Sequence, residues 1–139
     1  MEEFLTVRIA YIDCAEHLVM AMTSFRQTEG DFASRDLDVK GIPMNSFVQI
    51  LDALTERSVQ AAFIPVPAAM HLFSKGLDIK LVMFGHRSGS VMVQHPSIQK
   101  LVDFKGKSIL LPHELFIQTM LAHRLFAAAG ITLGTADSP

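Results

Sequence analysis

Short apolar runs alternate with amphipathic stretches along most of the chain. Alternating apolar and polar residues, as in 7–11, are typical of a strand, whereas Leu18, Met22 and Phe25 recur at the spacing of one helix face. Glycines and prolines separate these stretches, as they do at the ends of helices and strands. The pattern predicts strands at 7–11, 37–40, 60–64, 79–84, 91–94 and 108–111, and helices at about 15–26, 47–54, 66–74 and 115–129.

The order of these elements predicts the fold class. Strands that alternate with helices along a chain are typical of a mostly parallel sheet covered by helices on both faces. The chain has 139 residues, which is the length of one ordinary domain, and it contains no internal repeat. We therefore expect an α/β fold with three αβα layers.

The apolar content of the chain is high for its size. Half of its residues are apolar, and the mean hydropathy is +0.32. One interpretation is a well-packed core, since parallel strands are buried on both faces. The other is exposed apolar surface, which normally meets another part or a second copy of the chain. The sequence leaves both open, and the second predicts a homodimer.

Charge and hydropathy exclude two classes of partner. The net charge is -2, with 12 basic and 14 acidic residues and no basic stripe, so we expect no binding to nucleic acid. The longest apolar run, 61–73, contains Pro65 and Pro67 and is shorter than the roughly 20 residues of a membrane-spanning helix. The acidic N-terminus is unlike a secretory signal, which predicts either a cytoplasmic protein or an export signal outside this chain.

Four stretches, taken in order, resemble one family. They are 7–20, then 47–54 with 61–69, then 76–82 with 87–93, and finally 103–112, which contains Asp-Phe-Lys-Gly-Lys. Together they resemble the nitrate/sulfonate/bicarbonate group of ABC-transporter substrate-binding proteins, which includes binders of thiamine precursors. Two corners depart from the group's pattern: Arg57 begins a turn that is usually Gly-x-x-Asp, and Asp36-Leu37-Asp38 replaces the usual Glu-Gly-Leu-Asp.

The resemblance implies a fold, a function and a partner. It implies the type II periplasmic binding fold, with a first lobe at 1–93 and a hinge and incomplete second lobe at 94–139. A small anionic or polar organic ligand, such as nitrate, a sulfonate, bicarbonate or a thiamine precursor, would bind between the lobes. The partner would be the permease of an ABC importer, and the location would be the periplasm or cell envelope. We expect the chain to be such a solute-binding protein or its truncated remnant.

The resemblance also places the ligand near strand ends and helix N-termini, where backbone N–H groups favour an anion. The ligand-binding residues predicted on this basis are Asp13, His17, Ser46, Pro65, Arg87, Ser90 and His113. Several have structural alternatives. Asp13 with Glu16 resembles a helix-capping box, and Ser46 (or its neighbour Asn45) suits an N-cap. His17 also suits a buried, hydrogen-bonded histidine, and Arg87 a solvated charge on a turn.

Catalytic and metal-binding motifs are missing from the sequence. It contains no Gly-x-Ser-x-Gly elbow and no glycine-rich phosphate loop, and its six histidines never recur at the i, i+4 spacing of a helical zinc site. We therefore expect no metal, no cofactor and no enzyme activity. Cys14, the single cysteine, cannot form an intrachain disulfide, and beside His17 it is conceivable as a reactive thiol. The alternatives are a cytoplasmic enzyme relative in thiamine- or menaquinone-precursor synthesis, or a dimerising interaction fragment.

Overall fold

The computed structural model of the chain describes residues 5–32, 35–86 and 89–134. The contacts of the chain divide it into two compact units. The first unit consists of Met1–Ile64 with Ala68–Arg87, and the second consists of Pro65–Pro67 with Ser88–Pro139.

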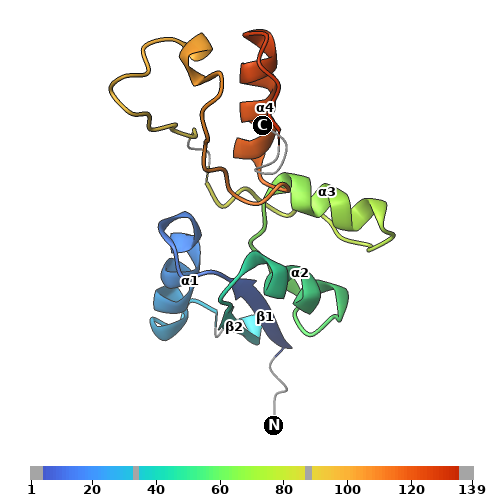
Figure 1. The fold of residues 1–139 in the computed structure, drawn as a ribbon. Coiled ribbons are helices and arrows are strands. Elements are labelled where there is room, and N and C mark those ends of the chain that lie inside the picture. Colours follow the sequence, from blue (N-terminus) through green and yellow to red (C-terminus); the bar gives the residue numbers. More distant parts are fainter. Residues whose placement is uncertain (1–4, 33–34, 87–88, 135–139) are drawn as a thin grey trace. The chain divides into compact units, whose positions relative to one another are not determined.

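The first unit is built on a parallel sheet of three strands (Figure 1). The central strand is β1 (Leu5–Tyr11), which pairs on one side with β2 (Leu37–Pro43) and on the other with the short β3 (Ala61–Ala62). The strand order is therefore β2-β1-β3, with all strands parallel. The predicted strands at 7–11, 37–40 and 60–64 and their parallel arrangement are confirmed.

Two helices connect these strands. The 3₁₀ turn η1 (Ala15–His17) and α1 (Leu18–Thr28) lead from β1 to β2, and α2 (Phe47–Thr55) leads from β2 to β3. The chain moves outward from β1 to β2 and then back across β1 to β3, so right-handed crossovers place the two helices on opposite sides of the strands. Figure 1 shows α1 and α2 in these positions.

The core of the first unit lies between β1 and α2. Ala10 and Ile50 are completely buried there, and Ala53 and Val59 are nearly so. Partly buried apolar residues surround them: Ile12, Ile42, Met44, Phe47, Leu54, Ala62 and Ile64. Small residues on the strand and larger ones on the helix allow the two elements to approach closely.

The other helix, α1, buries a different face from the one that its apolar stripe predicts. Leu18, Met22 and Phe25 remain 63%, 55% and 57% exposed, and the buried apolar residue of the helix is Met20. A methyl group on Gly41 of β2 would lie only 3.0 Å from the Met20 side chain, so Met20 packs directly on the sheet. Since apolar residues occur on more than one face of α1, their spacing alone could not identify the face that meets the sheet.

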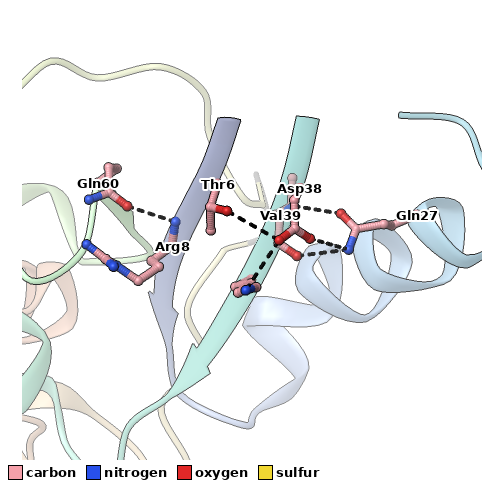
Figure 2. Close-up of polar contacts among 7 residues, drawn as sticks. Thr6, Arg8, Gln27, Asp38, Val39 and Gln60 are labelled. Carbon is pink, nitrogen blue, oxygen red and sulfur yellow. Dashed lines mark hydrogen bonds and ion pairs between the residues drawn. The ribbon is translucent and has the colours of Figure 1, made fainter. Parts of the chain in front are cut away.

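Two glutamine side chains pair with backbone groups of the strands (Figure 2). From α1, Gln27 accepts a hydrogen bond from the Val39 N–H at 2.7 Å and donates to the Val39 carbonyl at 3.2 Å and to the Asp38 carboxylate at 3.3 Å. On the other side, Gln60 Oε1 accepts a hydrogen bond from the Arg8 N–H at 2.9 Å. The two glutamines thus provide hydrogen-bond partners for backbone N–H and C=O groups that the neighbouring strands leave unpaired.

The second unit contains the C-terminal helix. The helix α3 (Val66–Ser74) begins in this unit and ends in the first, just before Gly76, whose φ is +91°. Further along the chain are η3 (Leu101–Phe104) and α4 (Ile117–Ala128). The predicted helices at 66–74 and 115–129 are therefore confirmed to within two residues at their ends.

The core of the second unit is small. Phe126 is completely buried, and its ring meets that of Phe104 edge-on at 5.1 Å. Ile98 and Ala122 complete the buried apolar set. Among the described helices, none combines the length and the apolar character that crossing a membrane requires.

Three predicted strands, at 79–84, 91–94 and 108–111, are wrong. None of these runs joins a sheet, and their apolar side chains stay exposed: Val82 by 88%, Val93 by 90% and Leu110 by 98%. Their composition suits a strand, but a strand also requires a neighbouring chain for its backbone hydrogen bonds. In the part of the chain that the structure describes, no such neighbour pairs with them.

Candidate functional site

The sheet order creates one position that α/β proteins commonly use for binding. The connection that leaves β1 leads to β2 on one side of the sheet, whereas β3 lies on the other side, so the strand order changes direction next to the carboxyl ends of β1 and β3. Ligands of open α/β sheets bind at this type of position. Here the segment Ile12–His17 follows β1, and Phe63 follows β3.

His17 is the best-anchored polar side chain at this edge. Its ring is 8% exposed, and its Nδ1 atom lies 3.0 Å from the Ile12 backbone nitrogen and 2.9 Å from the Ile12 carbonyl oxygen. The ring meets Phe63 at 5.2 Å with a tilt of 33° and meets Phe47 edge-on at 6.0 Å. The imidazole is therefore contacted by one residue after each strand: Ile12 after β1, Phe47 after β2 and Phe63 after β3.

Burial lowers the pKa of His17 below its usual value of 6.5, although the hydrogen bond to Ile12 and the charge of Glu16 act in the opposite direction. The nearby His86 adds to the lowering. His17 is therefore mainly neutral at pH 7. When its Nδ1 accepts the Ile12 N–H, the single ring proton resides on Nε2, which can then donate a hydrogen bond to a ligand.

Two helix caps were predicted near the site, one at Asp13 with Glu16 and one at Ser46, and the structure contains only the second. The capping box of Asp13 and Glu16 is wrong, because η1 begins after Cys14 and has no side-chain cap. Asp13 and Cys14 are both exposed, and the thiol makes no hydrogen bond with His17. The N-cap at Ser46 is confirmed: its hydroxyl accepts the Gln49 N–H of α2 at 3.3 Å.

The remaining predicted residues lie elsewhere in the chain. Pro65, Ser90 and His113 belong to the second unit, and Arg87 lies outside the described residues. His113 uses its Nδ1 atom to accept the Leu115 N–H at 3.2 Å. The structure thus brings together His17 and the start of α2 next to Ser46, and a joint site with the other residues stays a prediction.

A hollow of about 930 Å³ runs along α1 from η1. Its lining is mainly apolar and includes Leu18 and Met22 of the exposed α1 stripe, together with Glu16 and Gly85. A methyl group on Gly85 would lie 3.2 Å from the Phe63 ring, so Gly85 connects the hollow to the rings around His17. None of the predicted site residues that the structure describes lines this hollow.

Phe63 and Gly85 are the site residues that the sequence analysis missed. Phe63 is the first residue after β3, and residues at that position of a parallel sheet are natural candidates for a binding edge. Attention to strand ends would therefore have found it. No comparable signal marks Gly85. Its role is to leave room for the ring of Phe63, which is distant in sequence.

In the described ranges, no three histidine, cysteine or acidic side chains gather closely enough to hold a metal ion. Comparison with known proteins adds no identification: no family model, curated protein or solved structure matches the chain.

Proposed function

We propose that the chain is the first lobe of a solute-binding protein of an ABC importer, with the start of the second lobe in its second unit. The proposed ligand is a small polar or anionic organic molecule, held at the carboxyl edge of the sheet around His17. A parallel β2-β1-β3 sheet with helices on opposite sides is compatible with the αβα lobe of the type II periplasmic binding fold.

The backbone conformation at two turns, at Asp36 and Arg57, is the observation that supports the proposed family. Asp36 and Arg57 are the non-glycine residues of the described chain that have positive φ, at 50° and 58°. They stand at the two positions where the nitrate/sulfonate/bicarbonate group usually has glycine, which adopts this conformation without strain. A backbone conformation that suits glycine at both positions supports the proposed family.

The chemistry at His17 supports a small ligand with an acceptor oxygen. Nδ1 is held by Ile12, which leaves Nε2 to face another partner, and two aromatic rings restrict the space around it. Nitrate, bicarbonate and a sulfonate each carry such an oxygen, and the pyrimidine of a thiamine precursor offers a ring nitrogen as the acceptor instead. The N-terminus of α2, next to Ser46, favours negative charge at the same edge.

In this proposal the ligand works by hinge closure. It would contact the first lobe through the His17 edge and the second lobe through residues such as His113, and it would stabilise the closed arrangement by binding it more tightly. The closed form would then be recognised by the permease of the importer, in the periplasm or cell envelope.

The test is a thermal-shift screen with nitrate, bicarbonate, taurine as a sulfonate, and an aminopyrimidine. A ligand at 100 times its Kd should stabilise the protein by about 2.7 kcal/mol. We expect one of these classes to raise the melting temperature. We expect His17→Gln to weaken the binding about tenfold, as the loss of one hydrogen bond to a ligand would.

The control is His71→Gln, since His71 is exposed on α3 and should leave the affinity unchanged. Arg87→Ala tests the anion-binding role that the sequence predicts for Arg87. If no class of ligand shifts the melting temperature, or if His17→Gln binds as tightly as the unaltered protein, the proposed site is wrong.

A further inference from the structure

Two runs in the second unit that belong to no helix or sheet, Val91–Gln94 and Ser108–Leu111, have unpaired backbones. In the described chain none of their N–H or C=O groups takes part in a hydrogen bond. Both runs are rich in Val, Ile, Leu and Met, which are suited to strands or to apolar contacts. Each run therefore has backbone N–H and C=O groups that can pair with another chain.

The two runs border one hollow of about 430 Å³. Residues 92–95 and 107–111 line it, together with Ile98 and Phe104. Three residues of strand take up about 480 Å³, from a rise of about 3.3 Å per residue, a strand spacing of about 4.8 Å and a layer thickness of about 10 Å. The hollow thus has about the size of a short strand, with unpaired backbone groups on its border.

The first unit carries a run with the matching properties. Ile79–Phe84 belongs to no helix or sheet, and its backbone N–H and C=O groups likewise make no hydrogen bond in the described residues. Leu81, Val82, Met83 and Phe84 are 68%, 88%, 58% and 56% exposed. Lys80 is its single charged residue, so little charge has to be desolvated when the run is buried.

We propose that the protein forms a homodimer by reciprocal strand addition. About three residues of the Ile79–Phe84 run of one copy lie in the hollow of the other copy, between Val91–Gln94 and Ser108–Leu111, and pair with both of them. A two-fold axis then repeats the contact, so that both donor runs and both hollows are filled. Extended segments bind sheet edges in other proteins by the same main-chain pairing.

A second copy is the occupant that best matches these features. Once the hollow is filled, the backbone groups on its border lose water and need hydrogen-bond partners, which another main chain supplies and a small apolar molecule cannot. Each chain carries one donor run and one hollow, so a symmetric dimer leaves neither unfilled. The net charge of -2 gives only weak repulsion between two copies.

The test is the mass of the full chain in sedimentation equilibrium. We expect twice 15.3 kDa for the unaltered protein. In Ile109→Pro/Leu110→Pro the N–H group that faces the donor run is lost, whichever of the two it is, because successive N–H groups of a strand point to opposite edges. Dimerisation should weaken by about 100-fold or more. Because these amides make no hydrogen bond within the chain, circular dichroism should retain the helical signal. The control Ile109→Ala/Leu110→Ala keeps both amides and should dimerise within about tenfold of the unaltered protein.

A mixing experiment identifies the donor run. Val82→Pro/Met83→Pro should also be monomeric alone, because its donor run cannot pair. Mixed with Ile109→Pro/Leu110→Pro, it should form a dimer through the one donor and one hollow that remain intact. A monomeric unaltered protein, a proline variant that dimerises normally, or a mixture without dimers would each overturn the proposal. None of these outcomes depends on ligand binding at His17.

Discussion

At the scale of single residues, the contact between His17 and Ile12 explains why a buried imidazole is tolerated. One residue offers the ring nitrogen both an N–H, at 3.0 Å, and a carbonyl oxygen, at 2.9 Å. Nδ1 can accept from the first when the ring is neutral and donate to the second when it is charged. The ring therefore keeps a partner in both states, although burial still favours the neutral one.

This preference predicts how stability depends on pH. Because the pKa of His17 is lowered in the folded state, the unfolded chain binds more protons between that pKa and 6.5. The favourable contribution of neutral His17 is thus complete above about pH 6.5 and is lost as the pH falls through the folded pKa. When the pH is lowered from 7.5 to 5, the unfolding free energy should therefore fall less in His17→Gln than in the unaltered protein. Urea denaturation at the two pH values measures this difference. The same substitution at the exposed His71 should not reduce the loss, and an equal loss in both variants would contradict the assignment.

At the scale of elements, the outer edge of β2 is protected by a side chain of α1. Gln27 pairs with both the N–H and the C=O of Val39, and also contacts Asp38. β2 is an edge strand, and unpaired edges invite pairing with other chains. A helix that crosses the sheet thus supplies the hydrogen bonds of an absent neighbouring strand at this position.

We predict that Gln27→Ala lowers the unfolding free energy by about 1–3 kcal/mol, because the half-buried Val39 groups lose their partners. Gln27→Glu should be no more stable than Gln27→Ala, since its carboxylate would face Asp38. Urea denaturation measures both. The matched control is Gln60→Ala, which removes one exposed hydrogen bond and should cost less than about 1 kcal/mol. Equal losses at the two glutamines would contradict the edge-protection role.

At the scale of the whole molecule, the two units have separate cores. Ala10, Ile50, Ala53 and Val59 form that of the first unit, while Phe126 is central to that of the second. Units that bury their apolar residues separately can open separately, and each then has its own stability.

Hydrogen exchange should reveal this independence. Phe126→Ala removes a completely buried ring at a cost of about 3–5 kcal/mol, and it should abolish protection of α4 amides while those of β1 and α2 stay protected. Ile50→Ala should have the reverse effect. Loss of protection in both units from either substitution would mean that the chain unfolds as one cooperative body.

Much of the local structure could be predicted because its causes are local. The helix at 66–74 ends before Gly76, and the cap at Ser46 uses a hydroxyl three residues from its partner. Of the candidate site, His17 could be predicted from its place after the first strand. Phe63 could likewise have been found from its place after the third strand. Its contact with His17 could not, because 46 residues separate the two rings along the chain and only the sheet order brings them together.

The sequence by itself determined the parallel α/β start of this protein, since periodicity, caps and turn glycines act within a few residues of each other. The tertiary structure alone decided which face of α1 meets the sheet, and whether apolar runs such as 79–84 become strands. The physical reason is that a strand and a buried face are completed by groups from elsewhere. A run of Leu, Val, Met and Phe has the same local pattern whether or not a neighbouring backbone is there to pair with it.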